Sequence, residues 1–157
     1  MGHYAYLNSD NEVISVIVGK NEDDPTPDGF DSWEDYYLTK EPDATSCKRT
    51  SYNTQGNQHL NGGTAFRGNF ASVGMTYDPT NDVFYDTTAP FSSWTLNSNT
   101  YLYDPPVDYP SDANGGSNPD TSLPMKVYQW NETDTQWDLV RQYTYNAESL
   151  EWELDES

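Results

Sequence analysis

One short pattern recurs five times in this chain of 157 residues and limits what it can fold into. Each copy has an apolar or aromatic residue, then Asn or Asp, then five further residues, then a second apolar or aromatic residue. The copies are Leu7-Asn8 to Ile14, Tyr77-Asp78 to Phe84, Leu96-Asn97 to Tyr103, Trp130-Asn131 to Trp137, and Tyr145-Asn146 to Trp152. Turn-forming residues such as Pro79-Thr80-Asn81 lie between the two apolar positions. We predict that each copy is an antiparallel β-hairpin whose two apolar residues face each other.

The hairpin interpretation also predicts a second facing pair in each copy, two residues further from the turn on both strands. Three copies have apolar residues there: Ala5 with Val16, Tyr128 with Leu139, and Tyr143 with Leu154. The Asn or Asp at the start of each turn can accept a hydrogen bond from the backbone two residues later, as in an Asx turn. A helix is not expected in these segments because prolines such as Pro79 would break it.

Two irregular segments lie between the hairpins. Residues 53–69 are rich in Asn, Gln and Gly, and residues 104–124 contain five prolines and a Gly-Gly pair. We predict that both are long polar loops, and loops of this length are usually functional or lie against a partner.

A single short helix is expected near residues 32–38. Ser32 can cap its N-terminus and Asp35 follows three residues later, while Trp33, Tyr36 and Tyr37 would share one face. The predicted fold class is therefore all-β, with successive antiparallel β-hairpins in one or two small sheets, long polar loops and one short helix. We expect a hairpin-rich β domain over residues 1–126. The tandem aromatic hairpins over 127–157 either complete that domain or form a small module of their own.

Composition indicates an aromatic core and an acidic surface. The chain has 13 Tyr and 5 Trp, which bury large areas while keeping a polar group. It has 26 acidic and 7 basic residues, a net charge of −19. Such a charge repels phosphate and anionic lipid, so we expect neither nucleic acid nor membrane as a partner. No apolar run has the length of a membrane-spanning helix, and no signal-peptide pattern opens the chain.

We find no motif of catalytic, cofactor-binding or metal-ligating residues. A lone cysteine, Cys47, cannot form an intramolecular disulfide or a thiolate zinc site, and neither His3 nor His59 lies in a motif. Neighbouring acids such as Glu34-Asp35 do not define a glycosidase pair, which depends on spacing in space. Residues 112–120 have oxygen ligands but lack the alternating acids of a calcium loop, so a polar surface loop fits better. We predict a protein that is not an enzyme, with no catalytic residues, cofactor or metal.

The C-terminal hairpins contain the candidate contact residues, Trp130, Trp137, Tyr145 and Trp152. These rings could stack on sugars or contact a partner protein, with nearby Asp and Asn binding hydroxyl groups. The other interpretation is that they form the core of small sheets that have few aliphatic residues. A glycan-binding role predicts that Trp137 and Trp152 are exposed to solvent. A structural role predicts that they are buried or lie at a protein contact.

The order of several motifs resembles that of a known family. The motifs are HYAYLN (3–8) running to VIV (16–18), TSYNT (50–54), FRGNFASVGMTYD (66–78), PFSSWTLN (90–97) and YQWN (128–131) running to Trp137. In this order they resemble a family of small virion-associated structural proteins of tailed phages that infect cyanobacteria and other marine bacteria. The resemblance covers roughly residues 3–140. Residues 141–157 add a second copy of the closing hairpin, and residues 28–48 depart from the pattern.

The resemblance implies a virion component that is made in the host cytoplasm. We expect a non-enzymatic structural protein on the virion exterior, in multiple copies, whose partners are other capsid or tail proteins. Capsid decoration is favoured over a tail accessory role, because 157 residues leave no room for a long trimeric shaft. The alternative is a host-glycan (receptor) binding module of a tail fibre or tail tip, and a third hypothesis is a glycan-cleaving enzyme.

Overall fold

The structure is a computed structural model that describes residues 1–156. It consists mainly of small antiparallel sheets with one short α-helix, so the predicted all-β hairpin fold is confirmed. The chain forms two compact units. Unit 1 comprises Met1–Ala89 and Leu96–Tyr103, and unit 2 comprises Pro90–Thr95 and Asp104–Ser157. None of the helices in residues 1–156 is both long enough and apolar enough to cross a membrane.

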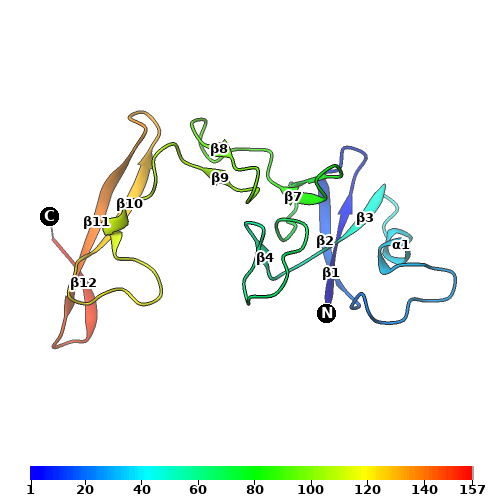
Figure 1. The fold of residues 1–157 in the computed structure, drawn as a ribbon, viewed down its shortest axis with the longest axis horizontal. Helices are drawn as coiled ribbons and strands as arrows, with labels where there is room; N and C mark the ends of the chain where they lie inside the picture. Colours follow the sequence, from blue (N-terminus) through cyan, green and yellow to red (C-terminus); the bar gives the residue numbers. More distant parts are fainter. Residues whose placement is uncertain (157) are drawn as a thin grey trace. The chain divides into compact units, whose positions relative to one another are not determined.

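Strand β1 (Gly2–Leu7) is the centre of unit 1, with β2 (Val13–Gly19) and β3 (Ser46–Thr50) antiparallel on its two sides (Figure 1). Tyr4, Ala5, Tyr6 and Leu7 are all buried. Alternate side chains of a strand point to opposite faces of its sheet. Tyr4 and Tyr6 therefore lie on one face and Ala5 and Leu7 on the other, so unit 1 has a core on each side of the sheet.

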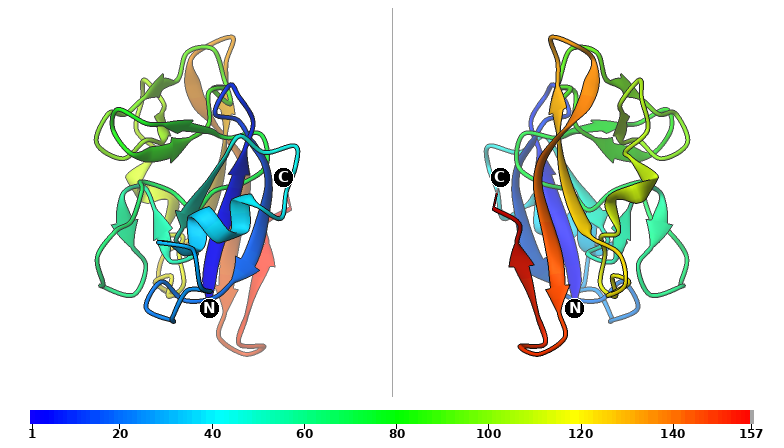
Figure 2. Two further views of the ribbon diagram at one scale, coloured as in Figure 1. Left: turned by 90° about the vertical axis from the view of Figure 1, so that its right-hand side faces the viewer. Right: turned by 90° about the vertical axis from the view of Figure 1, so that its left-hand side faces the viewer.

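Helix α1 (Trp33–Leu38) covers the face with Tyr4 and Tyr6 (Figure 2). Its predicted N-cap is confirmed, since Ser32 Oγ accepts a hydrogen bond from the Asp35 backbone N–H (3.1 Å). The predicted aromatic face is confirmed as well. Trp33 is buried with Tyr4, Tyr6 and Cys47, and Tyr36 and Tyr37 pack against this cluster.

The opposite face of the sheet packs against a hairpin formed by β6 (Thr76–Asp78) and β7 (Val83–Tyr85). Tyr77 and Phe84 face each other in this hairpin as predicted, with ring centroids 5.2 Å apart. Both rings belong to the buried cluster with Ala5 and Leu7, which Val13 and Ala71 complete. Residues from the first 85 positions thus build both cores of unit 1.

Most of the predicted hairpin pairings are observed. Besides Tyr77 with Phe84, the facing pairs are Trp130 with Trp137, Tyr145 with Trp152, Ala5 with Val16, Tyr128 with Leu139, and Tyr143 with Leu154. In the remaining copy, β8 (Thr95–Leu96) pairs with β9 (Tyr103–Asp104). The predicted pairing of Leu7 with Ile14 is wrong. A β-bulge between Tyr6 and Leu7 leaves Ile14 as an extra residue, and Leu7 faces Val13 instead.

The hairpin turns share one chemistry. In four of them the opening Asn or Asp accepts a hydrogen bond from the backbone N–H two residues later, at 2.8–2.9 Å: Asn8, Asp78, Asn97 and Asn146. In the fifth, Asn131 accepts from Asp134, three residues later (3.1 Å). Each turn also has a non-glycine residue at positive φ, between 49° and 61°: Asn11, Asp82, Tyr101, Thr135 and Leu150. These residues adopt the left-handed conformation in which longer hairpin loops end.

Residues 53–69 are not one long loop as predicted. They contain a small hairpin of β4 (Thr54–Gln55) and β5 (Gln58–His59). Gly56 and Asn57 form its two-residue turn, and both have a φ of 58°. Two consecutive positive φ values are the requirement of a type I′ turn, which glycine and asparagine meet best.

Unit 2 is built on a sheet of β10 (Met125–Asn131), β11 (Gln136–Asn146) and β12 (Glu151–Leu154), with β11 in the middle (Figure 1). The segment before it, predicted as a polar loop, has one 3₁₀ turn, η1 (Ser111–Ala113). A β-bulge opposite Val127 and Tyr128 adds Val140 to β11. An added residue reverses the alternation of side chains along a strand. In β11, the odd-numbered residues before Val140 and those after it therefore point to opposite faces of the sheet.

The two faces of this sheet therefore differ. The inner face comprises Lys126, Tyr128, Trp130, Trp137 and Leu139. Asp112 in η1 contacts this face by an ion pair with Lys126 (2.6 Å) and a hydrogen bond from the Tyr128 hydroxyl (3.0 Å). The outer face comprises Met125, Val127, Arg141, Tyr143, Tyr145, Trp152 and Leu154, and near the β10–β11 turn Gln129, Asn131, Gln136 and Asp138.

Candidate functional site

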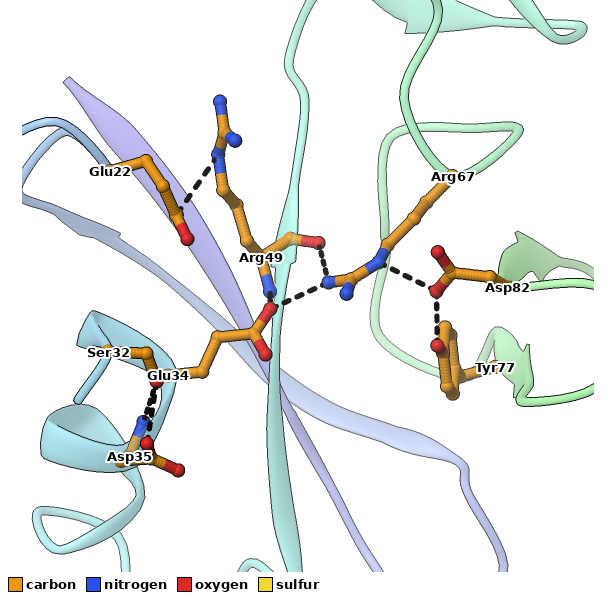
Figure 3. Close-up of polar contacts among 8 residues, drawn as sticks. All are labelled: Glu22, Ser32, Glu34, Asp35, Arg49, Arg67, Tyr77 and Asp82. Atoms are coloured by element: carbon orange, nitrogen blue, oxygen red, sulfur yellow. Dashed lines mark hydrogen bonds and ion pairs between the residues drawn. The ribbon is translucent and has the colours of Figure 1, made fainter.

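The most extensive charged cluster of unit 1 surrounds the guanidinium group of Arg67 (Figure 3). Arg67 Nη1 donates to Glu34 Oε1 (2.7 Å) and to the backbone carbonyl of Arg49 (2.9 Å). Its Nε donates to Asp82 Oδ1 (2.8 Å), which also accepts a hydrogen bond from the Tyr77 hydroxyl. Glu34 accepts a further hydrogen bond from the backbone N–H of Arg49 (2.7 Å). The cluster joins α1, β3 and the β6–β7 hairpin through one side chain.

The geometry of the Arg67 cluster is that of a structural connection. The guanidinium carbon lies 4.9 Å from the Phe66 ring centroid and 5.8 Å from that of Tyr77, so aromatic rings restrict its position. Burial, followed by the hydrogen bond to Asp82, raises the pKa of Tyr77 to about 12, so its hydroxyl stays protonated and donates. Both carboxylates are engaged by a permanently charged partner. The cluster is therefore suited to holding three elements together.

The neighbouring acids Glu34 and Asp35 point to different partners, as expected for successive residues of a helix. Glu34 contacts Arg67, whereas Asp35 accepts a hydrogen bond from the Ser32 hydroxyl (2.8 Å) (Figure 3). Each carboxylate thus has its own structural role, one at the Arg67 cluster and one at the helix N-terminus. They do not form the pair of facing carboxyl groups that glycoside hydrolysis uses.

A second carboxylate cluster lies in unit 2 at Glu132. Its oxygens accept hydrogen bonds from Ser92 Oγ (2.6 Å), Ser93 Oγ (2.7 Å), the Ser93 backbone N–H (2.9 Å) and Trp130 Nε1 (2.7 Å). The hydrogen bonds from Ser92, Trp130 and Ser93 lower the pKa of Glu132 to about 2. This carboxylate joins Pro90–Thr95 to the β10–β11 hairpin, which gives the PFSSW motif a structural role.

Trp130 and Trp137, two of the four candidate contact residues, belong to an aromatic cluster on the inner face. Trp130 is buried, and its ring centroid lies 5.2 Å from that of Trp137 and 6.0 Å from that of Trp94. Tyr109 packs edge-on against Trp137 at 4.9 Å. Trp137 Nε1 donates to the carbonyl of Val107 (2.8 Å). These contacts engage both indoles within unit 2 and leave neither ring free as a stacking surface.

Tyr145 and Trp152, the other two candidates, form a separate pair on the outer face. Their ring centroids are 5.4 Å apart, and both side chains are half-buried. They are not continuous with Trp130 and Trp137, because the bulge at Val140 places Tyr145 on the opposite side of the sheet from Trp137. The four residues therefore do not form one surface.

The outer face is mainly apolar away from the β10–β11 turn and has little cover there within unit 2. Met125, Tyr143 and Leu154 form a row across the three strands, beside the Tyr145–Trp152 pair. Leu154 is 56% exposed and Val127 is 37% exposed. Arg141 and Asp138 are the charged residues of this face, with Asp138 near the β10–β11 turn, because Glu151 and Glu153 of β12 alternate to the other side. Exposed apolar surface of this kind is typical of an interaction site.

Cys47 and the segment 112–120 are both held by contacts within the protein. Cys47 is buried, and that burial, followed by the nearby Glu34, raises the pKa of its thiol to about 12. Within residues 112–120, Asn114 donates to the Asp120 carbonyl (2.7 Å) and accepts from its N–H (2.8 Å), so the loop is held by its own bonds. Across residues 1–156, no group of three or more His, Cys or acidic side chains is arranged to hold a metal ion.

Comparison with protein families, with curated proteins and with solved structures finds no match to this chain. The Arg67 and Glu132 clusters are not among the residues predicted from sequence. Their members come from distant positions, such as Arg67 and Glu34 or Glu132 and Ser92, and no local spacing brings them together. Arg67 lies within the motif at residues 66–78, and Ser92 and Ser93 lie within the motif at residues 90–97.

Proposed function

We propose that this chain is a non-enzymatic structural protein on the exterior of a tailed-phage particle. It is made in the host cytoplasm and is present in multiple copies, as a capsid decoration protein in preference to a tail accessory protein. The order of motifs resembling the phage family supports the virion assignment. The single observation that carries the docking role is the exposed apolar outer face of β10, β11 and β12.

The partner of the outer face is an apolar patch on another virion protein. Burying exposed apolar side chains stabilises a contact by roughly 25 cal/mol per Å² removed from water. The outer face has one positive and one negative residue, Arg141 and Asp138, and so no net charge, in a chain whose net charge is −19. The acidic remainder of the surface keeps neighbouring copies apart and the protein soluble. The protein therefore attaches by the outer face and leaves its acidic surface exposed to solvent.

Binding to particles that lack this protein tests the proposal. The full-length chain co-sediments with such particles, whereas a Val127→Glu/Leu154→Glu double variant binds at least about tenfold more weakly, because it places charge in the apolar contact. Val18→Glu is the matched control, since Val18 is an exposed apolar strand residue of unit 1. Equal binding of the double variant and wild type, or no binding of wild type, would refute docking by the outer face.

The second candidate function is binding of a host surface glycan at a tail fibre or tail tip. The Tyr145–Trp152 pair favours it, because two partly exposed rings on one sheet face can stack against sugar rings. Trp130 and Trp137 do not contribute, since their rings are engaged on the inner face. A glycan array in which Trp152→Ala binds every sugar as well as wild type does would eliminate this site.

A further inference from the structure

An acid-free stretch stands out in unit 1. Residues 44–77 contain none of the 26 acidic residues, although about one residue in six is acidic over the whole chain. The stretch includes Arg49 and Arg67, and their charges are paired with acids from outside it: Glu22, Glu34 and Asp82. The stretch also includes Lys48, whose ammonium lies over the Tyr77 ring (5.6 Å). It therefore creates a region without acidic residues in a strongly acidic protein.

Two adjoining hollows open within unit 1 beside this stretch. One has a volume of about 340 Å³ and is walled by Tyr52, Phe70 and Met75. The other, of about 430 Å³, is walled by Gln58, His59 and Thr100. They share Gln55, Leu60 and Leu102, and together we call them the β4 groove. Among the described residues, no Asp, Glu, Lys or Arg lines either hollow.

The ring of Tyr52 is an exposed surface that its neighbours hold in place. Tyr52 is 65% exposed. The His3 ring stacks on it, with centroids 5.8 Å apart and planes inclined by 22°, and Phe70 contacts its edge at 6.1 Å. The Tyr52 hydroxyl has no hydrogen-bond partner in residues 1–156. A fixed, exposed aromatic ring loses little conformational entropy when a ligand stacks against it.

The groove combines this ring with neutral polar groups above a rigid floor. The side-chain amides of Gln55 and Gln58 make no hydrogen bond within residues 1–156 and remain available to a ligand. The floor is fixed by Asn69, which donates to the Phe84 carbonyl (3.0 Å) and accepts from the Gly56 N–H (2.8 Å). Gly56 has a φ of 58°, and a Cβ there would come within 3.1 Å of the Leu102 side chain. The hairpin and Leu102 are thus held in close contact.

We propose that the β4 groove binds a neutral saccharide. One sugar ring stacks on Tyr52, and its hydroxyl groups exchange hydrogen bonds with Gln55 and Gln58. The two hollows accept adjacent rings on either side of Leu60 and Leu102. An anionic glycan is disfavoured because no Lys or Arg lines the groove and the net charge of −19 repels it. This site is independent of the outer face and of where the protein lies on a particle.

An NMR titration of the full-length, ¹⁵N-labelled chain tests the site. The probes are three neutral hexasaccharides, cellohexaose, maltohexaose and mannohexaose, with hexagalacturonate as the anionic comparison. At least one neutral probe, added at up to about 10 mM, shifts the side-chain amide signals of Gln55 and Gln58. A dissociation constant in this range corresponds to a binding free energy of a few kcal/mol. Tyr52→Ala weakens that binding at least about tenfold, because it removes the stacking surface.

The control variant is Trp152→Ala, which removes one ring of the Tyr145–Trp152 pair in unit 2 and leaves groove binding unchanged. Because Tyr52 is mostly exposed, Tyr52→Ala retains the wild-type dispersion of signals, which separates lost binding from lost folding. Three outcomes would overturn the proposal. They are no shift with any neutral probe, shifts confined to Tyr145 and Trp152, and equal or stronger binding of hexagalacturonate.

Discussion

Replacing Arg67 with methionine should destabilise unit 1 strongly. The methionine keeps most of the apolar stem that packs beside Phe66 and Tyr77, but it removes every donor of the guanidinium group. Glu34 then loses its charged partner, and the carbonyl of Arg49 loses a hydrogen bond. The substitution therefore isolates the polar function of Arg67 from its packing.

The magnitude follows from the three contacts. The side chains of Arg67 and Glu34 are only 14% and 21% exposed, and a hydrogen bond between charged groups contributes about 1.5–3 kcal/mol. The hydrogen bond to the Arg49 carbonyl contributes about 1 kcal/mol. Asp82 is 57% exposed, so its ion pair contributes less than about 1 kcal/mol. We expect the free energy of unfolding of unit 1 to fall by about 3–4 kcal/mol.

Hydrogen exchange followed by mass spectrometry measures this effect in the full chain. The β1 amides exchange only when unit 1 opens, so a loss of 3–4 kcal/mol accelerates their exchange by at least about 100-fold. Arg49→Met is the matched control, because its ion pair with Glu22 is long (3.5 Å) and exposed and should change exchange less than about fivefold. Acceleration below about tenfold for Arg67→Met, or equal effects of the two variants, would refute the reasoning.

Three further predictions concern other sites. Hydrogen bonds lower the pKa of Glu132 from 4.5 to about 2 in the folded protein. The stability that this carboxylate provides is therefore complete above pH 4.5 and is lost as the pH falls from 4.5 to about 2. Glu132→Gln should flatten this loss in tryptophan-fluorescence melts, whereas Glu148→Gln should not. Thr135 has a φ of 49°, and Thr135→Asn should stabilise the chain by a few tenths to about 1 kcal/mol, because Asn tolerates that conformation better. In urea unfolding, Thr133→Asn should show no such gain. Burial raises the pKa of Cys47 to about 12, so iodoacetamide at neutral pH should alkylate it only after unfolding, and rapid alkylation of the folded chain would contradict its burial.

The hairpins could be predicted because a hairpin is encoded locally. Facing residues such as Tyr77 and Phe84 lie seven positions apart, and the turn between them uses side chains from the same segment. The helix at Trp33–Leu38 was predictable for the same reason, since its cap and its aromatic face fall within a few residues.

Bulges and short strands limited the rest of the fold prediction. The extra residue at Ile14 changed the partner of Leu7, and the one at Val140 reversed the faces of β11. Nothing in a single strand marks such an insertion, because it depends on how two strands pair. The β4–β5 hairpin has strands of two residues, too short to show alternation.

The sites were predicted less completely than the fold. Trp130, Trp137, Tyr145 and Trp152 were singled out as one group, and the structure divides them between two faces of the sheet. Arg67 reaches Glu34 across 33 positions, a contact set by tertiary packing and not by local spacing. The β4 groove likewise draws Leu102 beside Tyr52 from a separate hairpin.

Immunogold labelling of intact phage particles, with an antibody raised against this chain, tests the central proposal most directly. Exterior decoration predicts gold distributed over the heads of undisrupted particles. Gold confined to the tails would contradict decoration and favour the tail accessory role. Absence of gold from both intact and disrupted particles would contradict a place in the virion altogether.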